Sequence, residues 1–219
     1  MLEIQGLKVP GEPSVVLCDM DGTATVCTDS INFEATRQVV DRLGVTIDTE
    51  KYKLARGMSR EKGIEQILKA CMREDLLAKT KAIAEEKNRA ANLMREQLGP
   101  TNVPDADRAT LASLRKCGLR VALGSTSRNA LDTLNRVQLV SAFDAIVTGN
   151  EASEKAEIWR LALKYFAAPA EAAIVIEDSQ TGIDEALKLG VAFSVGIGSA
   201  PLRATVHAAC LGDLKVRLV

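Results

Sequence analysis

Five short apolar runs constrain most strongly what this chain can fold into. The runs do not alternate polar and apolar residues, so each is expected to be buried on both faces, as strands of a parallel sheet are. They are Ser14–Cys18, Arg120–Gly124, Ala145–Val147, Ala173–Ile176 and Ala192–Val195. Helical segments such as Asp105–Lys116 and Lys155–Phe166 lie between them. Strands that alternate with helices predict an α/β fold with a doubly wound parallel sheet of the Rossmann type.

The stretch from about residue 29 to residue 98 interrupts this alternation. It contains no convincing strand, and segments such as "SREKGIEQILKAC" have the spacing of amphipathic helices. We therefore expect residues 29–100 to form a helical domain inserted after the first strand. Residues 1–28 and 101–219 would form the α/β core, with hinges near Thr28 and in the turn-rich segment "GPTNVPDAD".

The composition narrows the class of protein. The chain has 219 residues, of which 47% are apolar and 26% charged, and a net charge of −1 provides no basic field for nucleic acid. No apolar run approaches the roughly 20 residues of a membrane span, and the first residues lack the pattern of a signal peptide. Five scattered cysteines without a C-x-x-C pair favour a reducing compartment. We expect a cytoplasmic monomer or small homo-oligomer that acts on a small molecule, without nucleic-acid or membrane partners.

Polar side chains gather where four of the predicted strands end. Ligands of open parallel sheets bind outside the carboxyl ends of the strands, so these side chains are expected to meet in one crevice. They are Asp19 and Asp21 after the first strand, Ser125 after the second, Lys155 after the third, and Glu177 and Asp178 after the fourth.

These residue types suit phosphoryl transfer. Four carboxylates are hard oxygen donors of the kind that Mg²⁺ prefers, and the cation would neutralise their charge. A lysine and small hydroxyl residues suit the oxygens of a phosphoryl group. One aspartate of such a site can attack phosphorus, while a second acid protonates the leaving group.

Each feature alone has a structural alternative. Asp21-Gly22 is also a hairpin-turn pair, and Glu177-Asp178 is also a helix N-cap. Ser125 and Lys155 are unremarkable singly. An EF-hand loop is excluded, because its glycine belongs at position 6 and here follows at position 4. The order and the strand-end placement of all four features together indicate a site.

These motifs resemble those of the haloacid dehalogenase superfamily, and most closely its β-phosphoglucomutase-like branch. "DMDGT" at 19–23 resembles the first motif, Ser125 in "ALGSTSRN" the second, Lys155 the third and "VIEDSQTGI" at 175–183 the fourth. The resemblance covers nearly the whole chain, and it implies a Rossmann-type core with an inserted helical cap.

The resemblance also implies roles for individual residues. Asp19 would be the nucleophile and Asp21 the acid/base. Mg²⁺ would be held by the side chains of Asp19, Glu177 and Asp178 and by the backbone carbonyl of Asp21. The residues implied to bind the transferring phosphate are Ser125, Thr126 and Lys155, with Gly22 in the same loop region; those implied to bind the rest of the substrate or a second phosphate are Arg60, Lys87, Ser127, Arg128 and Asn129.

The chain departs from the resemblance at three places. The mutases carry a histidine on the first cap helix that couples cap closure to proton transfer, and residues 32–34 here contain none. The linker "TATVCTDS" is about three residues longer than expected. The prolines that usually follow the lysine of the third motif are absent from "EKAEIW" at 154–159. The single histidine, His207, lies away from every motif.

Three functions follow from these observations. We prefer an Mg²⁺-dependent phosphatase that hydrolyses a small phosphorylated metabolite, and we expect that metabolite to be a sugar phosphate. The alternative is a phosphohexomutase, which the residues for a second phosphate favour and the missing histidine disfavours. A non-catalytic binding module is the remote third, because the nucleophile and the acids of the fourth motif are all present.

Overall fold

A six-stranded sheet forms the centre of the computed structural model, which describes residues 1–199 and 201–219. The strand order is β5-β4-β3-β6-β7-β8, and every neighbouring pair is parallel. The strands are β3 (Val15–Cys18), β4 (Arg120–Gly124), β5 (Ala145–Val147), β6 (Ala173–Glu177), β7 (Phe193–Ile197) and β8 (Val206–Ala208). The predicted parallel sheet is confirmed, and β8 is an additional strand at its edge.

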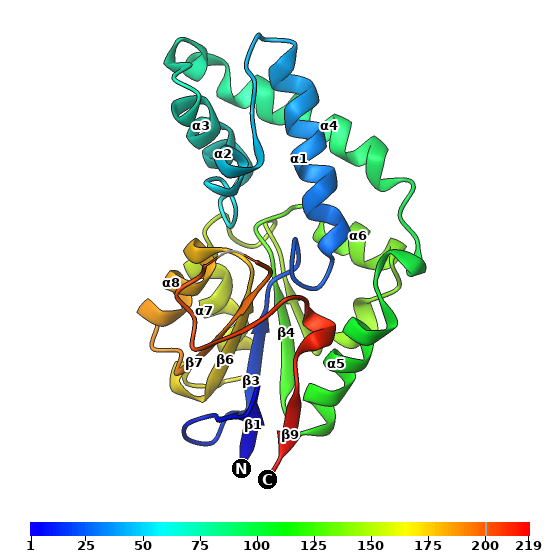
Figure 1. Ribbon diagram of the computed structural model, residues 1–219, viewed down its shortest axis with the longest axis vertical. Coiled ribbons are helices and arrows are strands. Elements are labelled where there is room, and N and C mark those ends of the chain that lie inside the picture. The colour runs from blue at the N-terminus through cyan, green and yellow to red at the C-terminus, as the bar shows by residue number, and fades with distance from the viewer. Residues whose placement is uncertain (200) are drawn as a thin grey trace.

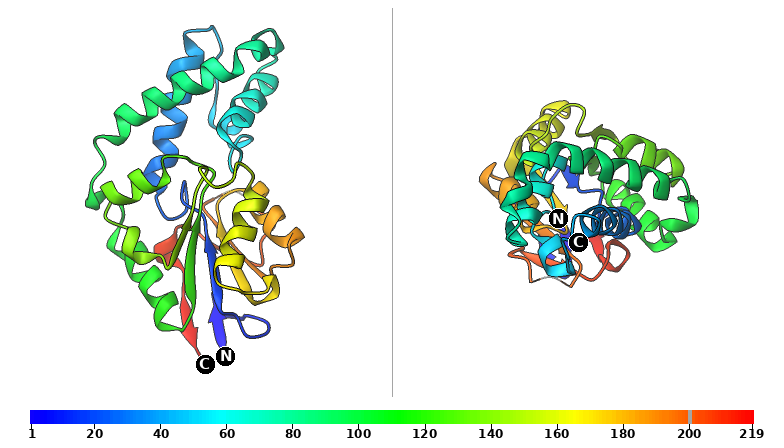
Figure 2. Two further views of the ribbon diagram at one scale, coloured as in Figure 1. Left: turned by 180° about the vertical axis from the view of Figure 1, so that it is seen from behind. Right: turned by 90° about the horizontal axis from the view of Figure 1, so that it is seen from above.

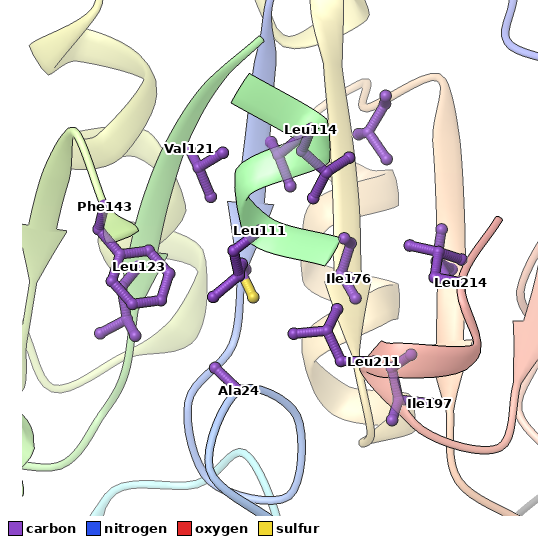
Figure 3. Packing of buried hydrophobic residues seen from close by; sticks show 14 of the residues in the cluster. Ala24, Leu111, Leu114, Val121, Leu123, Phe143, Ile176, Ile197, Leu211 and Leu214 are labelled. Atoms are coloured by element: carbon purple, nitrogen blue, oxygen red, sulfur yellow. The ribbon is translucent and has the colours of Figure 1, made fainter. Parts of the chain in front are cut away.

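Helices cover both faces of this sheet. Alternate residues of β3 belong to two separate apolar clusters, because neighbouring side chains of a strand point to opposite faces. One cluster joins Val16 to α5 and α6, and Figure 3 shows Leu111 and Leu114 of α5 packed in it near Ile176. The other joins Leu17 to α7 and α8. The helices are α5 (Asp105–Lys116), α6 (Ala130–Arg136), α7 (Lys155–Tyr165) and α8 (Gln180–Lys188). This arrangement confirms the doubly wound α/β prediction.

A small antiparallel sheet, which the sequence did not predict, joins the two ends of the chain. Its order is β2-β1-β9, formed by β1 (Leu2–Ile4), β2 (Leu7–Lys8) and β9 (Val216–Leu218). The amino group of Met1 donates a hydrogen bond to the carbonyl of Val219 at 3.0 Å. Both termini therefore lie together at the end of the molecule remote from the helices of residues 26–95 (Figure 1).

Four α-helices between β3 and α5 form a layer over the carboxyl ends of the strands (Figures 1 and 2). They are α1 (Val26–Asp41), α2 (Thr49–Lys53), α3 (Arg60–Ala70) and α4 (Thr80–Arg95). Residues 26–95 are all described and contain no strand. These helices pack on an apolar cluster of their own, which includes Val39, Ile64 and Leu68. We call this part of the chain the helical segment.

The start of α1 lies next to the expected hinge near Thr28. The helix begins at Val26, so Thr28 lies in its first turn, where its hydroxyl donates to the carbonyl of Thr25 at 2.7 Å. Thr28 is fully buried. The domain boundaries at residues 28 and 100 remain a prediction.

Helix α4 is amphipathic. Ile83, Ala84 and Ala91 are buried, whereas the charged side chains of Lys81, Glu85 and Arg89 are exposed. Within residues 1–199 and 201–219, no helix combines the length and apolar character that crossing a bilayer requires.

Candidate active site

A cavity of about 780 Å³ lies between the strand ends and the helical segment. Most of the residues that the sequence singled out line it together: Asp19, Asp21, Arg60, Lys87, Ser125, Thr126, Ser127, Arg128, Asn129 and Asp178. Lys155 and Glu177 are 3% and 1% exposed. Lys155 contacts the lining residue Asp19, and Glu177 accepts a hydrogen bond from the backbone N–H of the lining residue Asp178. The structure thus gathers side chains from four strand ends and from the helical segment around one space.

Lys155 holds the carboxylate that follows β3. As the first residue of α7, it donates hydrogen bonds to Asp19 Oδ1 and to the carbonyl of Gly124, the latter at 2.9 Å. Its Nζ also lies 4.4 Å from the centre of the Trp159 ring. Burial disfavours the charged form, but Asp19 and Glu177 outweigh it and raise the pKa of Lys155. The side chain is therefore a buried ammonium beside Asp19.

Three buried carboxylates form an acidic cluster next to this lysine. Oxygens of Asp19, Glu177 and Asp178 lie within 4.8 Å of one another. Burial, reinforced by Glu177, raises the pKa of Asp19 to about 8. Burial, reinforced by Asp19, raises the pKa of Asp178 well above its usual range. The cluster therefore holds more negative charge than its surroundings balance.

One carboxylate oxygen of Glu177 has no hydrogen-bond partner among the described residues. Its Oε1 accepts from the backbone N–H of Asp178 and of Ser179, each at 3.1 Å, and from the Ser179 hydroxyl at 2.9 Å. Its buried Oε2 has no hydrogen-bond partner among the described residues, although Lys155 Nζ lies 3.1 Å away. An orphaned oxygen, excess negative charge and an all-oxygen donor set fit a hard divalent cation such as Mg²⁺.

Two glycines make room for these carboxylates. Gly22 has φ +88°, and a Cβ there would lie 2.1 Å from Asp178 Oδ2. A Cβ on Gly182, in the first turn of α8, would lie 1.9 Å from Glu177 Oε2. Gly22, predicted as a phosphate-loop residue, thus contacts a proposed metal ligand.

Asp21 lies at the edge of the cavity beside the loop that follows β4. The hydroxyl of Ser125 is 3.5 Å from Asp21 Oδ2 and accepts from the backbone N–H of Ser127 at 3.1 Å. The Ser127 hydroxyl in turn accepts from the backbone N–H of Asn129 at 3.2 Å. These bonds fix the hydroxyl groups of Ser125 and Ser127, two residues that line the cavity.

The loop between α2 and α3 contacts the core at the acidic cluster. Arg56 makes an ion pair with Asp29 of α1, and its Nη1 lies 3.2 Å from Asp178 Oδ2. Thr126, predicted to bind phosphate, donates its hydroxyl to the carbonyl of Met58 at 3.2 Å. Sequence reasoning missed Arg56 and Asp29, because each alone resembles an ordinary exposed charge near a helix end.

Cations line the side of the cavity formed by the helical segment. Burial lowers the pKa of Arg60, and the neighbouring charges of Arg128 and Arg95 lower it further. Burial and Arg95 lower the pKa of Lys87 to about 8. Arg60 and Arg128 make no ion pair within the described part of the chain. This side therefore suits an additional anionic group of a ligand.

Two more polar residues of α4, Asn88 and Arg95, line this space, and Asn92 of the same helix lies next to them. Asn129 Nδ2 donates to Asn88 Oδ1 at 2.7 Å and to Asn92 Oδ1 at 3.1 Å. Arg95 Nη1 donates to Asn92 Oδ1 at 2.9 Å. The sequence predicted only Lys87 on this helix. The spacing of 88, 92 and 95 was the available signal, because residues three and four apart share one face of a helix.

Comparisons with known proteins agree on one family. The family model of haloacid dehalogenase-like hydrolases matches residues 16–195. A β-phosphoglucomutase of Bacillus subtilis is 29% identical over 189 residues, covering 84% of this chain and 82% of the relative. A phosphorylated carbohydrates phosphatase of Thermotoga maritima is 28% identical over 187 residues, covering 83% and 84%. The crystal structure of a β-phosphoglucomutase from Clostridium difficile superimposes with a TM-score of 0.81 at 23% identity, covering 91% of this chain and 92% of that one.

Proposed function

This chain belongs to the haloacid dehalogenase-like hydrolases, and we propose that it is an Mg²⁺-dependent phosphatase of small phosphorylated sugars. The observation that carries the proposal is Asp19, which lines the cavity while Lys155 holds its Oδ1. The names of two relatives, a β-phosphoglucomutase and a phosphorylated carbohydrates phosphatase, support a sugar phosphate as the substrate class.

In the first step, a carboxylate oxygen of Asp19 attacks phosphorus. The new bond makes an aspartyl-phosphate, and the bond between phosphorus and the sugar oxygen breaks. Asp21 supplies the proton that the departing oxygen needs. Ser125 and Thr126 hold the phosphoryl oxygens during the transfer, and Lys155 balances their charge from behind Asp19.

In the second step, water attacks the phosphorus of the aspartyl-phosphate. Asp21, now ionised, takes a proton from that water as the new bond forms. The bond between phosphorus and Asp19 breaks, inorganic phosphate leaves, and Asp19 regains its carboxylate. The site therefore returns to its starting protonation state after each turnover.

The acidic cluster would hold the cation. Asp19, Glu177 and Asp178 would supply side-chain oxygens, and the backbone carbonyl of Asp21 would complete the set. When bound, Mg²⁺ neutralises the carboxylates and the phosphoryl oxygens that they would otherwise repel.

A phosphohexomutase is the second candidate. Arg60 and Arg128 both line the cavity, make no ion pair among the described residues and suit a second phosphate. In that case the aspartyl-phosphate would be handed to another sugar hydroxyl instead of water. Residues 29–100 would then act as a cap that excludes water during transfer.

Product analysis separates the two functions. The purified protein is incubated with Mg²⁺ and a panel of hexose phosphates, and inorganic phosphate is measured beside the conversion of β-glucose 1-phosphate to glucose 6-phosphate. We expect release of phosphate from sugar phosphates, and none from the Asp19→Asn protein, which controls for a contaminating phosphatase. Clean isomerisation without release of phosphate would contradict hydrolysis and support the mutase.

A further inference from the structure

Asn32 of α1 lies between the helical segment and Asp21. Its Nδ2 donates to Asp21 Oδ1 at 3.0 Å. Its Oδ1 accepts from Lys87 Nζ at 2.7 Å and from Arg95 Nη2 at 2.9 Å, both on α4. One side-chain amide therefore joins two cations of α4 to the carboxylate that the proposed mechanism uses twice.

The orientation of this amide follows from its partners. Lysine and arginine side chains only donate hydrogen bonds, so the oxygen of Asn32 must face Lys87 and Arg95. The NH₂ group then faces Asp21, which accepts. Arg95 is 3% exposed, and its Nη1 donates a hydrogen bond to Asn92 Oδ1 at 2.9 Å. The guanidinium therefore has little freedom to move away from the side-chain amide of Asn32.

Asn32 is also the better-placed partner of Asp21. The other carboxylate oxygen, Oδ2, receives a long contact of 3.5 Å from Ser125 and no shorter hydrogen bond among the described residues. Oδ1 is thus anchored, and Oδ2 is available to exchange a proton with the leaving oxygen or with water. A neutral amide cannot pass a proton on, so its contribution is the placement of Asp21.

We propose that Asn32 is a positioning residue for the acid/base Asp21, and that Lys87 and Arg95 set its orientation from α4. This inference rests on the proposed function, because it requires that Asp21 transfer a proton. It also makes proton transfer depend on the seating of α4, since a shift of that helix releases the amide from its two donors.

Asn32→Asp tests the placement without dismantling the contacts to α4. The new carboxylate still accepts from Lys87 and Arg95, so the fold is retained, but the donor to Asp21 is lost and a like charge replaces it. We expect kcat to fall by about 10²-fold while KM changes less than about threefold and the thermal midpoint is kept. Asn32→Leu should give a similar fall in kcat. Gln38→Leu, which removes an exposed amide from the same helix, is the matched control.

A double-mutant cycle tests whether Arg95 acts through Asn32. We expect Arg95→Met to lower kcat in the wild-type background and to add little in the Asn32→Leu background. Independent, multiplicative effects of the two changes would overturn the inference. So would wild-type kcat in both Asn32 variants with their thermal midpoints unchanged.

Asp21→Asn distinguishes failure of this inference from failure of the proposed function. If Asp21→Asn keeps its turnover, Asp21 is not the acid/base and both proposals fail. If Asp21→Asn is inactive and Asn32→Asp keeps full kcat, the function stands and the role of Asn32 is wrong.

Discussion

At the scale of single residues, the balance of buried charge decides how each side chain of the site behaves. Lys155 lies within ion-pair distance of both Asp19 and Glu177, and all three are almost completely buried. Loss of one partner from such a group leaves an uncompensated charge, which costs far more than the pair contributes. Conservative substitutions are therefore the informative ones here.

Asp19→Asn should abolish turnover while the fold is kept. The amide retains the shape of the side chain and can still accept from Lys155, but it lacks the oxyanion that attacks phosphorus. We expect kcat to fall by about 10³-fold or more. Steady-state kinetics with a sugar phosphate measures the loss, and circular dichroism checks the fold. A protein that keeps a tenth of wild-type turnover would rule out the covalent mechanism.

Lys87 should make kcat/KM decline on the alkaline side of its pH profile. Its pKa of about 8 means that the side chain is charged below that pH and neutral above it. The groups that face it are Arg95 of the same helix, Asp21, Arg60 and Asp29. If the charged form binds substrate, kcat/KM falls as the pH rises through about 8.

Lys87→Arg tests this decline, because arginine stays charged throughout the range. We expect its kcat/KM to hold at pH values where the wild type declines. Lys87→Met should have a low kcat/KM at every pH. If kcat/KM of Lys87→Arg declines at the same pH as that of the wild type, the decline belongs to another titrating group.

The sequence could predict those site residues that lie beside a strand end or in a short motif. Asp19, Ser125 and Glu177 each follow an apolar run, so position alone marks them. Asn32 and Arg95 are different, because they are 63 residues apart and meet only through the packing of α1 on α4. No local sequence pattern predicts a contact between residues so far apart in the chain. An asparagine on a helix also does not by itself indicate a functional role.

At the scale of elements, the start of α8 links helix formation to the acidic cluster. Ser179 caps the helix by accepting from the backbone N–H of Gly182 at 3.1 Å, and its own N–H and hydroxyl hold Glu177. The same few residues therefore begin a helix and orient a proposed metal ligand. This explains why a glycine is needed where alanine would make a better helix.

Gly182→Ala should disturb cation binding. Alanine favours a helix interior over glycine by about 1 kcal/mol, but here its Cβ would lie 1.9 Å from Glu177 Oε2 and displace that carboxylate. We expect a weaker Mg²⁺ dependence of both activity and thermal midpoint.

Gly63→Ala in α3 is the matched control. Its Cβ would meet the Cβ of Ala55 at 3.5 Å, which is an ordinary contact. We expect it to raise the free energy of unfolding by about 0.5–1 kcal/mol and to leave the response to Mg²⁺ unchanged. Equal Mg²⁺ responses in the two variants would mean that Gly182 does not support Glu177.

The strands of the small antiparallel sheet, which the sequence did not predict, are short, and β2 and β9 are largely exposed. β1, β2 and β9 have three, two and three residues, and both residues of β2 are exposed. A run of this length shows no reliable periodicity. Their pairing also joins the two ends of the chain, which no local signal predicts. The five core strands were predictable because burial on both faces makes them continuously apolar.

At the scale of the whole molecule, the helical segment and the core have separate apolar clusters and meet mainly through polar contacts around the cavity. Asn129 contacts Asn88, Thr126 contacts Met58, and Lys62 makes an exposed ion pair with Glu154 at 2.8 Å. Polar contacts can be exchanged for water at small cost, whereas apolar cores cannot. The architecture thus favours opening and closing of the cavity with both cores intact.

Binding of Mg²⁺ should stabilise the whole fold. A ligand that binds only the native state adds about 2.7 kcal/mol at about a hundred times its Kd, which raises the thermal midpoint of a chain this size by about 5–10 °C. Asp178→Asn removes a proposed ligand, so its thermal midpoint should not respond to Mg²⁺.

The same variant should be at least as stable as the wild type without the cation. Because burial raises the pKa of Asp178 well above its usual range, its ionised form is disfavoured in the fold. In EDTA at neutral pH, the variant should therefore unfold at the wild-type temperature or higher. Thermal unfolding with EDTA and with Mg²⁺, at matched ionic strength, measures both effects. An equal rise in the two proteins would place the cation elsewhere.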